Sequence, residues 1–232
     1  MLDQAFEALK KFDYGTPLSD IQAIEDAVVA SNKDEAARKA IEQRLIQALG
    51  SPISRDAKDY ICRQLALVGS AASVPAVARL LANEGNAHLA RHALERIPGV
   101  EAEAALASAA KSLTGKLQLG AIGSLGVCGK SVAIATLANL LSHTDSAVVR
   151  GAALSLGAIG GVEAANALQS AIKAVRGDKN LMIDALLSCA ESLLKQKKSK
   201  EATAIYSALA EDNQPRLVRL AAARGLLACA GA

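Results

Sequence analysis

The sequence contains almost no aromatic side chains: aromatic residues make up 2% of the 232 residues, and tryptophan is absent. Apolar residues nevertheless make up 51% of the chain, so a core has to be built from Ala, Leu, Val and Ile. Small side chains let helices approach closely, and Ala and Leu have high helix propensity. Because no segment alternates apolar and polar residues over the length of a strand, we predict an all-α fold.

An excess of charge is also missing, because 26 basic and 23 acidic residues leave a net charge of +3. Binding to nucleic acid or to an acidic membrane surface usually requires clustered basic residues. Uncharged stretches such as 117–129 are shorter than the roughly 18 residues of a spanning helix. We therefore expect no nucleic-acid partner and no membrane association.

The amino-terminal residues MLDQAFEALKKF lack the apolar core of a secretory signal. We expect a soluble, cytoplasmic protein that is a monomer. The last residues, Gly231 and Ala232, fall where a helix pair would finish, so the sequence is also consistent with a piece of a longer protein, whose compartment it would not reveal.

Closely spaced cysteines are absent as well. The four cysteines are Cys62, Cys128, Cys189 and Cys229, and no two of them lie near each other in the sequence. This spacing excludes a sequence-local metal knuckle or redox motif. Each cysteine falls among Leu and Ala in the second helix of a predicted pair, so we interpret them as small core side chains.

A short phrase that ends in glycine recurs at the ends of successive helical segments. It reads Leu67-Val68-Gly69, Ile97-Pro98-Gly99, Val127-Cys128-Gly129, Ile159-Gly160-Gly161 and Cys229-Ala230-Gly231. The first three steps are nearly equal, at about 30 residues each, and the last step is more than twice as long and fits two longer units. Glycine tolerates the left-handed conformation in which many helices end. The phrase therefore predicts a regular helix stop.

Each repeat reads as helix, break and helix, for example 131–141 followed by 146–159. The second helices are apolar almost all round, as in Val148, Val149, Ala152, Ala153, Leu154, Leu156 and Ile159. Such a helix must be covered on several sides, which a stack of helix pairs provides. We predict a right-handed α-solenoid, an α–α superhelix of about six helix pairs.

The pairs are predicted to form one domain over residues 1–232. Residues 1–50 would form an N-terminal capping pair, with helices at 18–30 and 34–49. Residues 51–161 would hold the regular repeats, and residues 162–232 longer, partly tetratricopeptide-like repeats. Charged residues in the first pair suit a polar end unit; they are Asp26, Lys33, Asp34, Glu35, Arg38, Lys39, Glu42 and Arg44.

Residues 147–160, AVVRGAALSLGAIG, resemble the second helix of short HEAT repeats, the kind also found in phycobilin lyase proteins. The matching positions are Val149, Arg150, Ala152, Ala153, Leu156, Gly157, Ile159 and Gly160. Ser146 stands where that pattern usually has an acidic residue, and we expect its side chain to cap the helix. The resemblance implies a HEAT fold over about residues 20–231 and, since that family consists mostly of scaffolds, no particular activity.

His88 and His92 are the weak candidates for a metal site, because they are four residues apart with Glu95 three residues further on. On a helix these side chains share one face, and two imidazoles with a carboxylate can bind a divalent ion. A solvated polar stripe has the same spacing, and we favour that interpretation. We expect no metal and no cofactor.

We interpret the chain as a non-catalytic protein–protein interaction scaffold that presents a concave surface formed by the second helices. Polar residues of both charges on these helices suit a protein partner better than a polyanion. The candidate partner-binding residues are Arg63, Arg91, Glu95, Arg150, Asp184 and Arg219, and further polar positions are Arg55, Asp59, His88, Lys116, Gln118, Asn180 and Arg216. In HEAT repeats the arginine that matches Arg150 often braces the neighbouring unit, so a purely structural role stays open for it.

The alternative is a HEAT-like DNA-binding enzyme such as an alkylpurine DNA glycosylase. Such an enzyme uses aromatic side chains against the damaged base, with a carboxylate beside them. This chain lacks tryptophan, and Tyr14, Tyr60 and Tyr206 are scattered along it. We therefore expect no catalytic residues.

Overall fold

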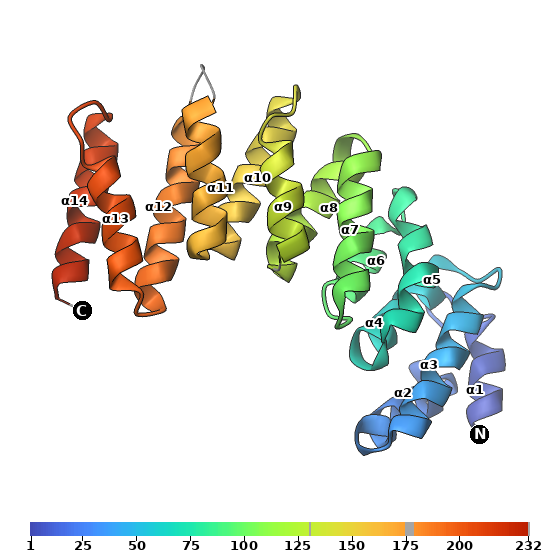
Figure 1. Cartoon of the computed structure of the whole chain (residues 1–232). Coiled ribbons are helices and arrows are strands. Elements are labelled where there is room, and N and C mark those ends of the chain that lie inside the picture. The colour runs from blue at the N-terminus through green and yellow to red at the C-terminus, as the bar shows by residue number, and fades with distance from the viewer. Residues whose placement is uncertain (130, 175–178, 232) are drawn as a thin grey trace. The chain divides into compact units, whose positions relative to one another are not determined.

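The computed structural model describes residues 1–129, 131–174 and 179–231. These residues form α-helices and short 3-10 turns without any strand (Figure 1), so the all-α prediction is confirmed. The chain forms two compact units, Met1–Ala121 and Ile122–Ala232. Helix α8 contributes residues to both units.

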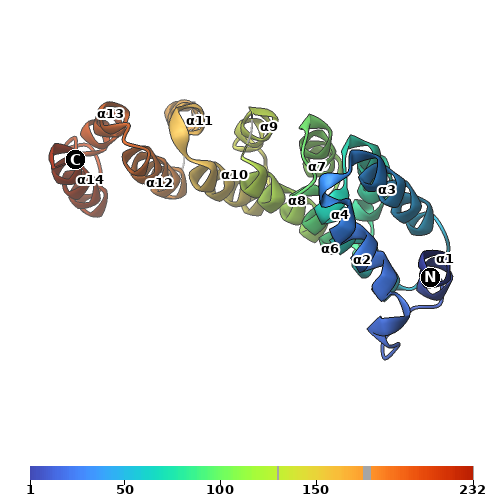
Figure 2. The same ribbon diagram turned by 90° about the horizontal axis from the view of Figure 1, so that it is seen from below.

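The first unit is built from successive helix pairs. Its helices are α1 (Leu2–Leu9), α2 (Gln22–Ala30), α3 (Glu35–Leu49), α4 (Arg55–Val68), α5 (Val74–Ala78), α6 (Ala87–Leu94), α7 (Val100–Ser112) and the first part of α8 (Gly115–Cys128). Short 3-10 turns at Leu18–Asp20, Ser31–Lys33, Ala71–Ser73 and Arg79–Ala82 adjoin α2, α3 and α5. Helices α3, α5 and α7 pack in one layer and α2, α4 and α6 in another (Figure 2).

The second unit repeats this arrangement with longer helices. After the end of α8 it contains α9 (Ser131–Leu140), α10 (Ser146–Ile159), α11 (Gly161–Ala174), α12 (Asn180–Lys195), α13 (Ser199–Leu209) and α14 (Arg216–Ala230). Each odd-numbered helix packs against the even-numbered helix that follows, and α12 packs between α10 and α14 (Figure 2). Each unit is thus a stack of helix pairs of the α-solenoid class, as predicted.

The pairing at the amino terminus differs from the prediction. The segments 18–30 and 34–49 were expected to pair with each other, but α2 pairs with α1 and α3 pairs with α4. The described residues form fourteen α-helices, which agrees with the predicted solenoid of about six helix pairs. In α1, the side chains of Ala5, Phe6 and Leu9 are buried, so the short, charged segment at the start of the chain is an amphipathic helix.

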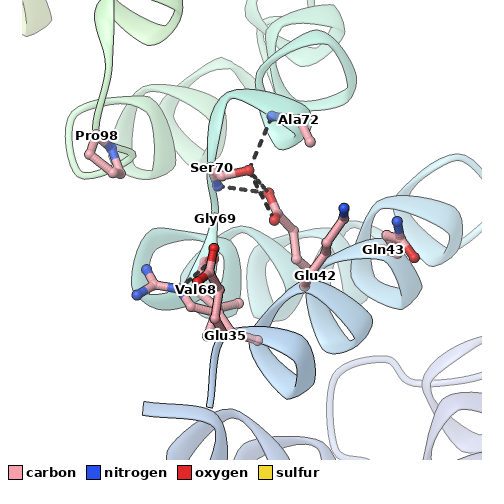
Figure 3. Close-up of a pocket in the computed structure, with 10 residues that line it drawn as sticks. Glu35, Glu42, Gln43, Val68, Gly69, Ser70, Ala72 and Pro98 are labelled. Atoms are coloured by element: carbon pink, nitrogen blue, oxygen red, sulfur yellow. Dashed lines mark hydrogen bonds between the residues drawn. The ribbon is translucent and has the colours of Figure 1, made fainter. Parts of the chain in front are cut away.

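The charged residues of the expected capping pair do not all face solvent. Glu42 on α3 is buried, with 4% of its surface exposed. Its Oε1 accepts hydrogen bonds from the backbone N–H of Ser70 (2.7 Å) and from the Ser70 hydroxyl (2.9 Å) (Figure 3). It also accepts a hydrogen bond from the Ser73 hydroxyl. Glu42 therefore caps the 3-10 turn that leads into α5.

A second charged side chain of α3 holds the end of α4. Nε of Arg38 donates to the carbonyl oxygen of Val68 (3.1 Å), and Nη2 donates to that of Leu67 (3.0 Å). The last carbonyls of a helix have no partner within the helix. Arg38 and Glu42 thus bind α3 to both sides of the turn after α4.

The recurring glycines have more than one structural reason. Gly129 and Gly160 have φ of 67°, the left-handed conformation that glycine adopts without strain. Gly69 has φ of −63° and is extended, so the expected left-handed helix stop is wrong there. A Cβ on Gly69 would lie 2.4 Å from the carbonyl oxygen of Leu65 in α4 and 2.9 Å from Cγ1 of Ile97. The end of α4 and the close packing of Ile97 therefore both require this glycine.

Helix α10 is packed closely against its neighbours through small residues. The Ser155 hydroxyl donates to the carbonyl of Ile122 on α8 (3.0 Å), and a Cβ on Gly157 would lie 3.1 Å from Cα of Ala185 on α12. The helix is not covered all round, because Leu154 is 55% exposed. Its cap also differs from the prediction: the side chain of Asp145, and not of Ser146, accepts from the backbone N–H of Ala147.

Two of the four cysteines lie in the core as predicted: Cys62 is 1% exposed and Cys189 is fully buried. The Cys189 thiol donates to the carbonyl of Leu156. Burial raises the pKa of each thiol from 9.0 to about 12. Both thiols thus stay protonated at neutral pH and are poor nucleophiles.

The raised pKa values predict a loss of stability at alkaline pH. The unfolded chain releases the Cys62 and Cys189 protons near pH 9, whereas the folded protein retains them to about pH 12. Deprotonation therefore favours the unfolded state between these values, by up to about 1 kcal/mol per pH unit for each thiol. Urea unfolding between pH 8 and pH 11 measures the effect. The Cys62→Ala/Cys189→Ala variant should show a shallower decline than the protein; equal slopes for the two would refute the assignment.

None of the helices in the described parts of the chain is both long enough and apolar enough to cross a membrane.

Candidate partner-binding surface

The six candidate partner-binding residues all lie on even-numbered helices or directly after one. They are Arg63 on α4, Arg91 on α6 and Glu95 directly after α6 in the first unit, and Arg150 on α10, Asp184 on α12 and Arg219 on α14 in the second. Their role in binding stays a prediction. The structure shows which of them share a cavity.

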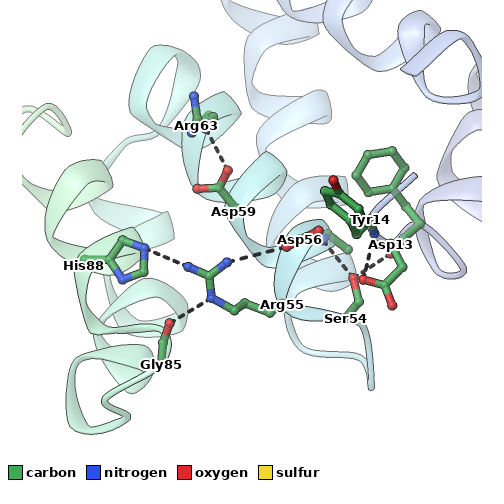
Figure 4. Close-up of polar contacts among 11 residues, drawn as sticks. Asp13, Tyr14, Ser54, Arg55, Asp56, Asp59, Arg63, Gly85 and His88 are labelled. Carbon is green, nitrogen blue, oxygen red and sulfur yellow. Dashed lines mark hydrogen bonds and ion pairs between the residues drawn. The ribbon is translucent and has the colours of Figure 1, made fainter. Parts of the chain in front are cut away.

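Three polar residues of α4 form one wall of a cavity in the first unit. Arg55, Asp59 and Arg63 follow at steps of four residues and therefore share one side of the helix. Nε of Arg63 donates to Oδ2 of Asp59 over 2.8 Å (Figure 4). The cavity, called the first polar pocket below, has a volume of about 400 Å³ and is lined by Arg55, Asp59, Arg63, His88, Leu89 and His92.

The guanidinium group of Arg55 connects α4 to the start of α6. Its Nε donates to the carbonyl oxygen of Gly85 (3.2 Å), and its Nη2 lies 3.1 Å from Nε2 of His88. Its Nη1 lies 3.5 Å from Oδ1 of Asp56 (Figure 4). Each nitrogen of the guanidinium group thus has one partner, which fixes its position in the wall of the first polar pocket.

A second, smaller cavity lies between α6 and the start of α8. This second polar pocket has a volume of about 170 Å³ and is lined by Glu84, Ala87, His88, Arg91, Lys116 and Leu117. His88 lines both pockets, so they are adjacent. Arg91 lies tightly against α8, because a Cβ on Gly120 would be 2.6 Å from its Nη1. Arg91 therefore has a packing role beside any role in binding.

The histidine pair is placed against arginines and not around a metal site. Nε2 of His88 faces Arg55, and Nδ1 of His92 lies 3.2 Å from Nη1 of Arg96. A guanidinium can only donate hydrogen bonds, so each histidine ring uses a lone pair to accept from an arginine. The positive charge of that arginine would repel a metal ion at the same nitrogen. In the residues that the structure describes, no three His, Cys, Asp or Glu side chains converge in a way that could hold a metal.

The three candidates of the second unit have different surroundings. Arg150 and Asp184 are exposed on α10 and α12. Arg219 is half-buried, and its Nη1 forms an ion pair with Asp212 in the segment before α14. Arg219 therefore stabilises the connection between α13 and α14, whereas Arg150 and Asp184 remain accessible to a partner.

Some of the polar positions have roles that the sequence did not indicate. Gln118 was expected on the surface, but it is 6% exposed and its Nε2 donates to the carbonyl of Ala110 (3.0 Å), which joins α8 to α7. Arg55 and Lys116 were named among the further polar positions and not among the six candidates, and both line the polar pockets. Only the separation of Arg55 from His88 along the sequence, which is close to the length of one repeat, could have brought them together.

A family model for HEAT repeats matches residues 102–186. No curated protein matches the chain. Human deoxyhypusine hydroxylase in complex with glycerol is similar in structure, with 16% identity, 100% of this chain and 96% of that chain covered, and a TM-score of 0.38. One engineered protein has 18% identity, with 90% of this chain and 97% of that chain covered, and a TM-score of 0.41. A second engineered protein has 21% identity, with 97% of this chain and 68% of that chain covered, and a TM-score of 0.42. These three similarities are too weak to transfer any activity. Residues 102–186 therefore match HEAT repeats, and the helix pairs stacked in each unit agree with that match.

Proposed function

We propose that the chain is a non-catalytic scaffold whose even-numbered helices bind a partner protein. HEAT repeats generally mediate protein interactions. The observation that supports the proposal most is the pair of adjacent polar pockets on α4, α6 and α8, which bring charged side chains from three helices to one surface.

A non-catalytic role agrees with the chemistry of the reactive groups. The Cys62 and Cys189 thiols have pKa values raised to about 12 by burial, and the His88 and His92 rings are bonded to arginines. A thiolate nucleophile needs a lowered pKa, and a general base needs a free lone pair. These groups are therefore unsuited to nucleophilic catalysis.

Three narrower proposals come from the sequence. The repeat length of about 30 residues favours the short HEAT class that also occurs in phycobilin lyase proteins. The net charge of +3 favours a protein partner over nucleic acid or membrane. The third proposal is that the chain is a monomer in the cytoplasm.

The proposal predicts that charge reversal at accessible even-helix residues weakens partner binding without destabilising the fold. Arg63→Glu tests the first unit and Arg150→Glu the second, and each should lower the affinity for a partner by about 2 kcal/mol if the residue is a hot spot. Arg91 is unsuitable because it packs against Gly120. The measurement is affinity purification from the source cells, followed by titration of the recovered partner and by thermal melting.

Lys111→Glu is the matched control, because Lys111 is exposed on the odd-numbered helix α7. It makes the same change of charge away from the proposed surface and should leave binding unchanged. Recovery of no protein above background, or equal affinity for all three variants, would reject the scaffold. Release of a methylated base from DNA would establish the alternative instead.

A further inference from the structure

We infer that the two polar pockets bind an acidic segment of the partner, with one carboxylate in each pocket. The inference rests on the proposed scaffold function and specifies the chemistry that the surface recognises. It is carried by the charge of the pockets, by their hydrogen-bond donors, by the fixed position of Arg55 and by the spacing of the pockets.

Each pocket is lined by more basic than acidic side chains. In the first polar pocket the lining guanidinium groups are those of Arg55 and Arg63 and the lining carboxylate is that of Asp59, while Asp56, outside the lining, also contacts Arg55. In the second, Arg91 and Lys116 stand against Glu84. Opposite charges that meet across an interface set the specificity of binding and speed association. A carboxylate in the first pocket would share the guanidinium groups with Asp56 and Asp59, and a carboxylate in the second pocket would pair with Arg91 or Lys116.

The neutral groups of the pockets also act as donors. Nε2 of His88 accepts from Arg55, so the hydrogen of the neutral ring is on Nδ1. Nδ1 of His92 accepts from Arg96, so its ring hydrogen is on Nε2. The acceptor capacity of both rings is thus used, and what they can offer a ligand is an N–H group. A carboxylate only accepts hydrogen bonds and therefore matches both rings.

The basic side chains of the pockets include one that is fixed in place and two that have no partner of their own. Arg55 is held by Gly85, His88 and Asp56 and still has one free N–H on each of its two terminal nitrogens. Within the described part of the chain, the side chains of Arg91 and Lys116 form no hydrogen bond or ion pair. Because Arg55 is already ordered, it loses less entropy when a ligand binds than an unheld side chain does.

The spacing of the pockets suits an extended segment. The first pocket lies against α6 on the α4 side and the second on the α8 side, so their centres are separated by about one helix spacing, roughly 8–10 Å. A polyproline II segment rises about 3.1 Å per residue with three residues per turn, so residues three apart lie about 9 Å apart on the same side. Two glutamates separated by two residues therefore fit the two pockets.

The interleaved acidic groups disfavour a nucleic acid on this surface. Asp59 and Glu84 line the pockets, and Glu95 follows α6. A continuous phosphate backbone would carry a row of negative charges past these carboxylates, whereas two separate glutamates bring only one negative charge to each pocket. Like charges placed opposite each other reject the wrong partner. An acidic protein segment is thus favoured over a polyanion.

The test is a titration of the full chain with a fluorescein-labelled peptide that contains Glu-Pro-Pro-Glu between Gly-Ser ends. The matched peptide carries Gln-Pro-Pro-Gln. At low salt we expect fluorescence anisotropy to show at least tenfold tighter binding of the glutamate peptide. Arg63→Glu in the first pocket and Lys116→Glu in the second should each weaken its binding about fivefold or more, and Lys111→Glu should leave it unchanged.

The inference would be overturned if the glutamate peptide did not bind at about 1 mM, which is the limit of weak recognition. Equal binding of the glutamate and glutamine peptides would also overturn it. So would binding of the glutamate peptide to the Arg63→Glu and Lys116→Glu variants with the affinity of the unchanged protein. Tighter binding of a single-stranded oligonucleotide of equal charge, lost in the same variants, would assign the pockets to nucleic acid. A partner that is recovered by affinity purification and resists both pocket substitutions would reject the acidic segment while the scaffold function stands. Peptide binding without any recoverable partner would reject the scaffold function, while the acidic-segment inference stands.

Discussion

Replacement of Glu42 by alanine is expected to lower the free energy of unfolding of the Met1–Ala121 unit by about 3 kcal/mol. The carboxylate is buried and accepts from the backbone N–H and hydroxyl of Ser70 (Figure 3). It also accepts from the hydroxyl of Ser73. Its loss leaves these donors without their acceptor, and each buried unsatisfied donor is costly. Urea unfolding followed by circular dichroism at 222 nm measures the effect.

Two further variants separate the hydrogen bonds from other effects. Lys39→Ala removes an exposed side chain from the same helix and should change stability by less than about 0.5 kcal/mol. Glu42→Gln keeps the shape but replaces one acceptor oxygen by a donor, so it should fall between the two. If Glu42→Ala unfolds at the same urea concentration as Lys39→Ala, the carboxylate does not hold the turn together.

The helix ends were predictable because their causes are local. Residues 146–159 were expected to form a helix, and α10 has these bounds, since a polar residue caps its start and Gly160 with positive φ ends it. Asp145 and Ser146 are adjacent, and either side chain can cap a helix, so the predicted cap was wrong by one residue.

The polar network could not be predicted because its partners are about one repeat apart. Glu42 reaches Ser70 28 residues away, and Arg55 reaches the carbonyl of Gly85 30 residues away. In the sequence both side chains resemble ordinary charged residues of a solvated helix face. Only the stacking of successive pairs shows that Glu42 is buried and that Arg55 belongs to a pocket.

The pairing error has the same origin. The charge pattern of residues 18–49 is compatible with two neighbouring helices, and α2 does precede α3 in the chain. The actual partner of α2 is α1, whose apolar face consists of Ala5, Phe6 and Leu9. Arg44 on α3 also contacts α1, through an ion pair with Asp3 and a position 4.2 Å above the Phe6 ring. These contacts between distant residues decide the register of the pairs.

Replacement of Gly225 by alanine is expected to destabilise the Ile122–Ala232 unit by about 2 kcal/mol, although alanine favours a helix by about 1 kcal/mol over glycine. A Cβ at position 225 on α14 would lie 2.4 to 2.5 Å from three ring atoms of Tyr206 on α13. The Tyr206 ring is only 3% exposed, so it cannot move aside without a shift of the helices. Overpacking should therefore outweigh the gain in helix propensity.

The control is Gly123→Ala, because Gly123 also lies within a helix, α8, and its Cβ would meet nothing within 4 Å. That variant should be more stable by up to about 1 kcal/mol. In the double variant Tyr206→Leu/Gly225→Ala the clash is removed, so the second substitution should cost less than it does beside tyrosine, as a double-mutant cycle measures. Gly123→Ala and Gly225→Ala are the same substitution at two helix positions. If the first raises the free energy of unfolding and the second lowers it, the cause of the difference is the contact between α13 and α14. Equal stabilisation by both would show that Tyr206 yields to the added methyl group and that this contact does not fix the position of α14.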